Sequence, residues 1–255
     1  RDRSVSRGLG DVYKRQSKNA AKPEYCSSAF TLCERALISC SVVTGAFLVR
    51  IRDSWYHRSN EKSVHGYAKG AAEMKKLSIP VGISDFEKIR NGGFYYIDKS
   101  GLIAEILNEK AEVTLITRPR RFGKTLGMSM LESFFDIRKD SRKLFEGLEI
   151  AEHQALCKEW MNRYPTITIS FRQIDGLNFI DAYQQLVYEI ALLYQNHRYL
   201  LDSQAISKQE KALFQQLSDR KAKKTDVLRS IQFLTLLLNK YYNKKVILLI
   251  DEYDV

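Results

Sequence analysis

The chain has 255 residues, of which 44% are hydrophobic and 28% charged, an ordinary composition for one large globular domain or two small ones. No apolar run approaches the roughly 18 residues that a membrane-spanning helix needs, so we expect no membrane span. The net charge of +11 is shared between residues 1–73 (13 Lys and Arg against 7 Asp and Glu) and residues 74–255 (28 against 23). The second part is only mildly basic, so charge alone makes nucleic-acid binding a minority hypothesis.

Residues 1–73 are not expected to form part of the folded domain. Arg1–Gln16 has no helical or strand periodicity and resembles a translated sequencing-adapter peptide. Met74, followed by two lysines, is the expected true start, so residues 1–73 are predicted to be a non-native or disordered leader. The competing interpretation is a disordered basic arm. With this segment set aside Cys157 is the remaining cysteine, which fits a reducing, cytoplasmic location.

Residues 74–112 are predicted to lead into a sheet. Ser84 and Asp85 can cap a helical turn, and Phe94–Ile97 is a strand candidate. Asp98 is expected to cap a helix whose apolar residues between 102 and 107 recur at helical spacing. These elements are interpreted as packing elements, and stacking of the aromatic run on a base is the weaker alternative.

A phosphate-binding segment is predicted after a short buried strand at Val113–Thr117. Glycine lets the backbone approach phosphates, lysine reaches the β and γ oxygens, and a threonine hydroxyl can ligate Mg²⁺. The first glycine of the usual G-x-x-x-x-G-K-[ST] pattern is replaced by arginine, and the three arginines either neutralise phosphate charge or face solvent and acidic neighbours. The candidate nucleotide-binding residues are Arg118, Pro119, Arg120, Arg121, Phe122, Gly123, Lys124, Thr125 and Leu126.

The middle of the chain alternates helix and strand patterns. Residues 165–171 are rich in β-branched side chains and are predicted to add a strand to the sheet. Residues 179–194 have the apolar spacing of an amphipathic helix, and Ser207 with Glu210 forms a capping box for the next one. Thr225 is expected to cap a final helix that extends to Tyr241.

A second buried strand, Val246–Ile250, ends in adjacent carboxylates, as a Walker B strand does. Asp251 and Thr125 are the candidate Mg²⁺ ligands, and Glu252 is the candidate catalytic residue that activates water. The alternative is that these carboxylates lie at a solvated strand edge without a function. The apolar run before them and the matching Gly-Lys-Thr argue against it. Asp254 also completes a DExD pattern, but helicases have a phosphate loop richer in glycine.

Four motifs together resemble the bacterial AAA-ATPase-like family: ISDFEKIR from Ile83, YYIDKS from Tyr95, RPRRFGKT from Arg118 and LLIDEYD from Leu248. Arginine in place of the first glycine is the form that this family uses. The resemblance covers Met74–Val255 and implies an ATPase core, often followed by a PD-(D/E)XK nuclease-like domain. Contact with nucleic acid would then come through a C-terminal domain that is missing here.

The expected fold is therefore α/β, with a parallel-sheet P-loop NTPase core over residues 113–255 that is truncated after the Walker B strand. The expected function is ATP binding with Mg²⁺-dependent hydrolysis, and ATP and Mg²⁺ are the expected cofactors. The alternatives are a nucleotide-dependent switch module with little turnover, a DExD-type helicase or a phosphotransferase. We expect this fragment to be inactive alone, and the sequence leaves the coupled process and the oligomeric state open.

Overall fold

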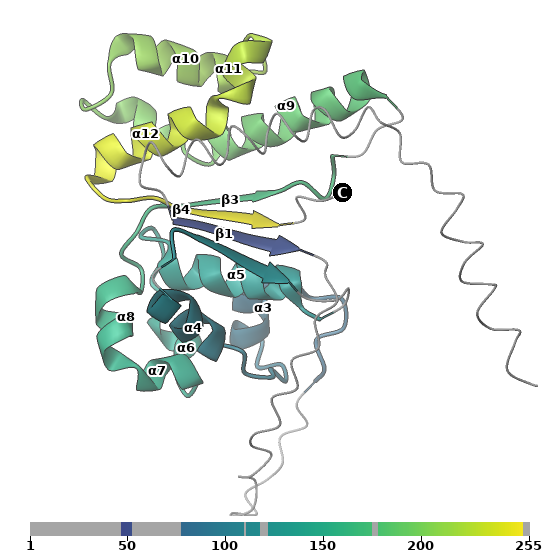
Figure 1. Cartoon of the computed structure of the whole chain (residues 1–255), viewed down its shortest axis with the longest axis vertical. Helices are drawn as coiled ribbons and strands as arrows, with labels where there is room; N and C mark the ends of the chain where they lie inside the picture. The colour runs from purple at the N-terminus through teal and green to yellow at the C-terminus, as the bar shows by residue number, and fades with distance from the viewer. Residues whose placement is uncertain (1–46, 53–77, 110, 118–121, 175–177, 252–255) are drawn as a thin grey trace, which may run out of the picture.

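The computed structural model describes residues 47–52, 78–109, 111–117, 122–174 and 178–251, and for residues 47–52 and 117 the backbone alone. Its centre is one parallel sheet with the strand order β2-β1-β4-β3 (Figure 1). The strands are β1 (Phe47–Arg52), β2 (Val113–Thr117), β3 (Thr166–Ser170) and β4 (Ile247–Asp251). Helices lie on both faces of this sheet, which is compatible with the predicted α/β class.

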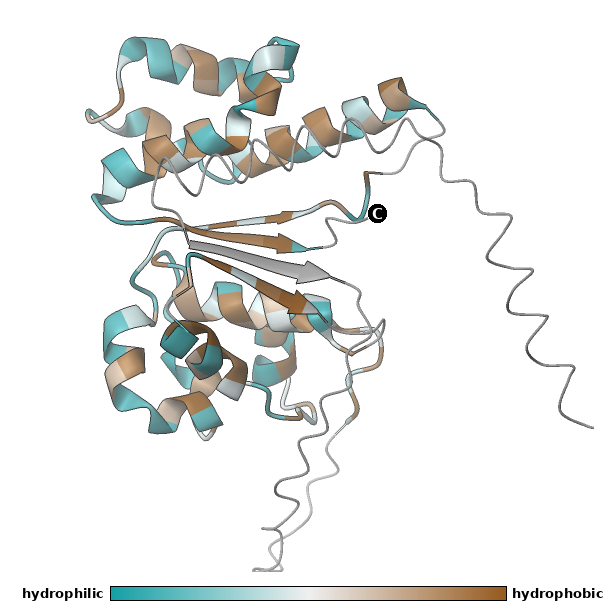
Figure 2. Ribbon diagram, viewed as in Figure 1, coloured by the Kyte–Doolittle hydropathy of each residue, from teal (hydrophilic) through white to brown (hydrophobic). Residues whose placement is uncertain are grey.

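Strand β4 is buried over its whole length because helices cover it on both faces. Leu248 and Ile250 point into one core cluster, and Ile247 and Leu249 point into the other. In Figure 2, β4 accordingly has the brown of hydrophobic residues along most of its length. The strand predicted at residues 113–117 is confirmed, and the strands predicted at 165–171 and 246–250 are confirmed to within one residue at each end.

One face of the sheet is covered by the helices that precede β3 in the chain (Figure 1). Helix α5 lies along this face, and four of its own side chains are completely buried: Met130, Leu131, Phe134 and Phe135. Burying side chains of this size stabilises the fold by about 1.5–3 kcal/mol each. The helices are α3 (Phe86–Asn91), α4 (Gly101–Glu109), α5 (Lys124–Phe135), α6 (Arg142–Phe145), α7 (Glu149–Glu152) and α8 (Gln154–Trp160).

The opposite face is covered over β3 and β4 by helices from the second half of the chain (Figure 1). The predicted capping box is present at the start of α10, where Ser207 and Glu210 bond to each other's backbone amides. On β2 this face is open, since Val113 and Leu115 are 43% and 46% exposed. The elements are α9 (Phe179–Gln195), η1 (Arg198–Asp202), α10 (Lys208–Ser218), α11 (Lys224–Leu228) and α12 (Ser230–Tyr242).

Two predicted elements differ from the structure. The final helix is two helices, α11 and α12, separated at Arg229, so Thr225 is not its cap. The strand candidate Phe94–Ile97 is irregular chain outside the sheet, where the Tyr95 amide donates to the Ser78 carbonyl at 3.0 Å. Tyr96 is instead fixed by its side chain, which meets the Phe86 ring edge-on with the two centroids 5.3 Å apart.

Strand β1 comes from the segment that was predicted to be a leader. It pairs in parallel with β2 from Leu48 to Arg52 and with β4 from Phe47 to Arg50. Six residues of that segment thus pair in the sheet, and the leader assignment for residues 1–73 stays a prediction. The physical reason for this pairing is that β2 and β4 do not pair with each other, so a strand between them must satisfy the facing backbone groups of both.

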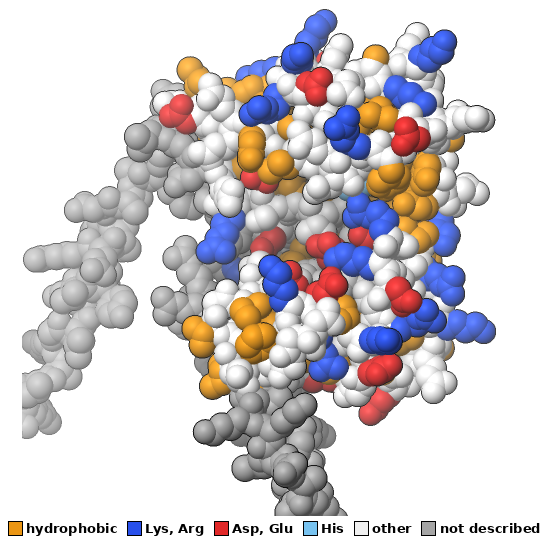
Figure 3. All heavy atoms as spheres, turned by 180° about the vertical axis from the view of Figure 1, so that it is seen from behind, with side chains coloured by type: hydrophobic (Ala, Val, Ile, Leu, Met, Phe, Trp, Pro, Cys, Tyr) orange, Lys and Arg blue, Asp and Glu red, His pale blue; other side chains and the backbone are white. Residues whose placement is uncertain are grey.

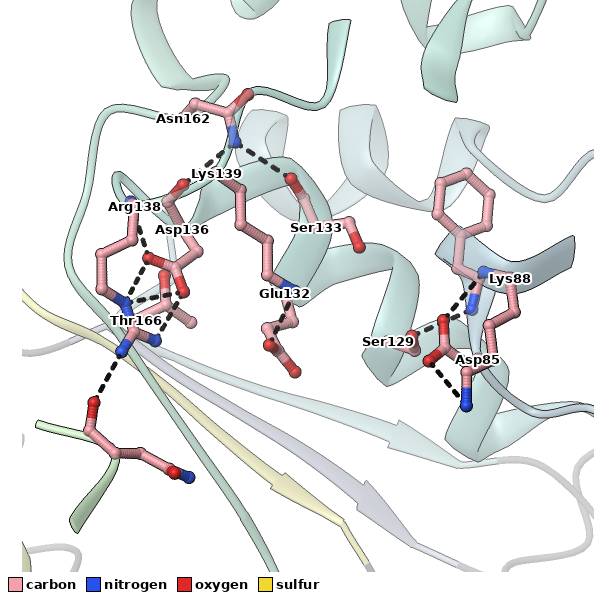
Figure 4. A network of polar contacts seen from close by, with 12 residues as sticks. Asp85, Lys88, Ser129, Glu132, Ser133, Asp136, Arg138, Lys139, Asn162 and Thr166 are labelled. Carbon is pink, nitrogen blue, oxygen red and sulfur yellow. Dashed lines mark hydrogen bonds and ion pairs between the residues drawn. The ribbon is translucent and has the colours of Figure 1, made fainter. Parts of the chain in front are cut away.

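A partly buried ion pair joins the two layers of helices at the edge where the strands begin (Figure 4). Asp136 follows α5, is fully buried, and accepts from the Arg138 guanidinium at 3.0 and 2.7 Å. The same guanidinium donates to the carbonyl of Asn196 at the end of α9, at 3.3 Å. This contact links α5, on one side of the sheet, to α9 on the other.

Candidate functional site

The candidate site begins where the chain leaves β2 and enters α5. Gly123 has a left-handed backbone (φ 74°) and precedes the helix without a side-chain cap, a conformation that glycine adopts at no steric cost. The first amides of α5 are therefore not satisfied by a capping side chain. A helix start of this kind favours a negatively charged ligand through both its backbone donors and its dipole.

Lys124 is the first residue of α5 and is buried, with 9% of its surface exposed. Thr125 and Leu126 are half-buried, and Leu126 packs against the core on the α5 side of the sheet. Phe122 is 59% exposed. A buried ammonium at a helix start favours a negative charge close by, which makes Lys124 a candidate ligand for an anion.

A second lysine reaches the same turn, and no role was predicted for it. Lys99 Nζ donates to the Phe122 carbonyl oxygen at 3.2 Å and would lie 3.5 Å from a Cβ at position 123. Lys99 belongs to the YYIDKS motif, which was the available signal in the sequence. Its neighbour Asp98 accepts from the amides of Ser100 (2.8 Å) and Glu149 (2.7 Å), which holds this part of the chain in place.

Asp251 ends β4 on the same edge of the sheet. All strands are parallel, and Arg50 of β1 is level with both Leu115 of β2 and Ile250 of β4. Side chains alternate along a strand, so Asp251 faces the same way as Ile247 and Leu249, toward the α5 side. Because β1 separates β2 from β4, these two strands are roughly 10 Å apart.

The Asp251 side chain has an unusual environment. It is 4% exposed, and its Oδ1 has no hydrogen-bond partner among the described residues. A buried carboxylate oxygen normally pairs with a donor or a metal ion, because leaving it unpaired costs free energy. Asp251 is therefore the described residue most clearly in need of a ligand, and an oxygen donor of this kind suits a hard cation such as Mg²⁺.

Several predicted site residues lie outside the described part of the chain. These are Arg118, Pro119, Arg120, Arg121 and Glu252, and their predicted roles stay predictions. Within the described part, Lys124 and Thr125 begin α5 directly after Gly123, and Asp251 ends β4 at the same edge of the sheet. No group of three or more His, Cys, Asp or Glu side chains in that part is placed to enclose a metal ion.

Comparison with known proteins identifies the family. Residues 80–255 match the family described as "Predicted AAA-ATPase". The chain belongs to this predicted AAA-ATPase family. Membership supports a generic ATPase-like function and nucleotide binding. None of the helices in the described ranges is long and apolar enough to cross a membrane.

A curated relative is also similar to this AAA-ATPase family member. It is the "Uncharacterized protein in vnfD 5'region" of Azotobacter chroococcum mcd 1, 30% identical over 182 residues. The match covers 71% of the present chain but 30% of the relative, so the chain spans about three tenths of that protein's length. No solved structure matches the chain.

Proposed function

We propose that this chain is the nucleotide-binding part of an ATPase that binds ATP with Mg²⁺ and hydrolyses it. The observation that carries the proposal is the buried Oδ1 of Asp251, which has no hydrogen-bond partner among the described residues. Asp251 is at the same edge of the sheet as the start of α5 and faces the α5 side. In this role Lys124 and the first amides of α5 hold the phosphates, as in a P-loop. Asp251 and Thr125 hold Mg²⁺, which neutralises charge on the phosphate oxygens when bound.

Lys99 extends this assignment. Its ammonium group bonds to the carbonyl of Phe122, directly before the left-handed glycine. It therefore holds the turn in the conformation that presents the helix amides, and it adds positive charge beside them. Glu252 keeps its predicted role as the base that accepts a proton from the attacking water. A nucleic-acid partner of the longer protein stays a prediction.

The first experiment measures binding of a fluorescent ATP analogue to the 255-residue chain, with and without Mg²⁺. Lys124→Ala should weaken binding about 10- to 100-fold, because a charge-assisted hydrogen bond contributes roughly 1.5–3 kcal/mol. Lys88→Ala is the matched control, since that lysine is on α3 with its side chain 76% exposed, and it should bind as the wild type does. Equal affinity of Lys124→Ala and wild type would refute the phosphate site.

The second experiment uses the unpaired charge of Asp251. Asp251→Asn removes a buried charge, so it should leave the melting temperature of the free protein unchanged or raise it. The same variant should lose the Mg²⁺ dependence of nucleotide binding. A purely structural carboxylate would give the opposite pattern: a lower melting temperature with Mg²⁺ dependence intact.

Hydrolysis is tested with Glu252→Gln, in the longest available form of the protein. This variant keeps the hydrogen-bonding capacity of the side chain but cannot accept a proton. It should bind Mg²⁺-ATP normally while hydrolysis slows about 10²-fold or more. Wild-type turnover at background, unchanged by Glu252→Gln, would favour the switch module instead.

A further inference from the structure

A cavity lies at the far end of α5, away from the proposed nucleotide site. It has a volume of about 450 Å³ and opens between the segment after α5 and the segment that includes α8. Helix α5 has 12 residues, so this cavity is roughly 18 Å from the Lys124 end of the helix. The lining residues are Lys139, Asp140, Arg142, Cys157, Lys158, Met161, Asn162 and Arg163.

The wall of this cavity is held by hydrogen bonds from one asparagine (Figure 4). Asn162 has a left-handed backbone (φ 54°), which asparagine tolerates better than most residues. Its amide nitrogen donates to the carbonyls of Ser133 (3.1 Å) and Asp136 (3.0 Å), and its oxygen accepts from the Ser141 amide (3.0 Å). The cavity is thus preformed between two segments joined by these bonds.

The lining has an apolar part as well as charged ones. Met161 supplies a thioether, and Cys157 is half-buried with its thiol donating to the Ile150 carbonyl at 3.2 Å. Burial raises the pKa of the Cys157 thiol, so the group stays neutral at physiological pH. A ligand in this cavity would meet an uncharged surface beside the cations.

Two of the four lining cations are neutralised by acids. Lys139 pairs with Glu132 at 2.9 Å, and Arg142 pairs with Asp140 at 2.7 Å. Hydrogen bonding from Arg142 lowers the pKa of Asp140 to about 2, so that carboxylate is ionised at neutral pH.

The other two cations, Lys158 and Arg163, are exposed, and neither side chain has an ion-pair partner among the described residues. Among the described residues they therefore leave about two uncompensated charges at the cavity. Figure 3 shows Lys and Arg side chains interspersed with Asp and Glu on this side of the molecule, on the right of the view.

We propose that this cavity binds a small phosphomonoester, with its phosphate on Lys158 and Arg163 and its body against Met161 and Cys157. A phosphomonoester carries a charge of about −1.5 to −2 at pH 7, which matches the two uncompensated cations. An arginine guanidinium fork suits phosphate oxygens geometrically. The volume suits a small ligand rather than a nucleic-acid duplex, since small-molecule sites occupy about 300–1,000 Å³.

Cys157 reports on occupancy because it lines the cavity. The test measures alkylation of Cys157 in the full chain by a neutral thiol reagent, followed by peptide mass spectrometry that separates it from the other cysteines. Saturating ribose 5-phosphate should slow alkylation of Cys157 at least about threefold, and ribose should not. The double variant Lys158→Ala/Arg163→Ala should lose this protection while keeping the wild-type melting temperature, since both side chains are exposed.

Two control variants test whether the protection arises in this cavity. Lys88→Ala/Lys208→Ala removes two exposed lysines elsewhere, on α3 and α10, and should keep the protection. Lys124→Ala disables the proposed nucleotide site and should also keep it, so failure of one proposal is distinguishable from failure of the other. Absence of protection, or its loss in Lys124→Ala alone, would overturn the proposal. Protection by a 5′-phosphorylated oligonucleotide but not by ribose 5-phosphate would overturn it in favour of nucleic acid.

Discussion

Proline in the middle of β1 tests whether this strand is part of the sheet in solution. Val49 is in register with Thr114 of β2 and with Leu249 of β4, so its backbone lies between two parallel ladders. Val49→Pro removes a ladder donor and leaves a buried carbonyl on a neighbouring strand unpaired. The lost hydrogen bond costs about 1 kcal/mol, and the unpaired carbonyl about 1–3 kcal/mol more. We therefore expect the free energy of unfolding to fall by roughly 2–4 kcal/mol.

The assay is thermal and urea unfolding of the full chain, monitored by circular dichroism. For a folded unit of this size the loss corresponds to a decrease of roughly 5–15 °C in melting temperature. Val49→Thr keeps the amide and the β-branched side chain, so it is the matched control and should change stability little. A chain that starts at Met74 lacks β1 altogether and should lose hydrogen-exchange protection at Leu248–Ile250 as well.

The opposite result would refute this reasoning. If both Val49→Pro and the Met74 chain unfold like the wild type, then β1 does not pair with β2 and β4 in solution. The prediction that residues 1–73 form a leader would then stand in full. Another segment would have to pair with the two facing strands, because β4 is buried on both faces and cannot leave a strand edge unsatisfied without cost.

Two further predictions concern contacts at the edge of the sheet where the strands begin, opposite the candidate site. Asp136→Asn should lower the free energy of unfolding by about 2–4 kcal/mol in urea titrations, because it leaves the partly buried Arg138 guanidinium unpaired. The control is Asp140→Asn, which breaks an exposed pair and should change the free energy of unfolding little. Similar effects of the two substitutions would contradict the assigned burial. His197 Nδ1 lies 2.8 Å from the Leu193 carbonyl, so this nitrogen carries the proton, and burial lowers the pKa of His197 below its ordinary 6.5. The unfolded chain therefore takes up a proton first as pH falls, and stability should drop below about pH 6.5. The asparagine of His197→Asn can still donate to the Leu193 carbonyl but does not titrate. Between about pH 8 and about pH 5.5 the melting temperature of this variant should therefore fall less than that of the wild type. Parallel curves of melting temperature against pH would exclude His197 as the source of the pH dependence.

Local chemistry made much of this protein predictable from its sequence. The strands β2 and β4 are short segments rich in Val, Ile, Leu and Thr, which favours a strand, although only β4 is buried on both faces. The capping box of α10 needs two side chains three residues apart, so it too is visible in the sequence. The candidate residues Gly123, Lys124 and Asp251 were identifiable because phosphate and metal binding require those residue types at those ends of a strand and a helix.

Contacts between distant segments decided the rest. The break between α11 and α12 is at Arg229. The carbonyl of the next residue, Ser230, accepts from the buried Tyr194 hydroxyl at 2.6 Å, and nothing near position 230 in the sequence indicates that partner. The approach of Lys99 to the Phe122 carbonyl likewise joins two segments 23 residues apart. Such pairings depend on which surfaces meet after the core has formed, so they leave no local periodicity to read.

The place of β1 is the clearest example of the difference. Its sequence, FLVRIR, is compatible with a strand, but propensity says nothing about which strands it will join. The structure places it between β2 and β4 because those two strands need a partner for their facing backbone groups. The same arrangement sets the distance between the Lys124 and Asp251 sides of the candidate site. The sequence by itself determined which residues could bind phosphate and metal. The pairing of the strands decided where those residues lie relative to one another, because backbone hydrogen bonds in a sheet form between strands and not within one.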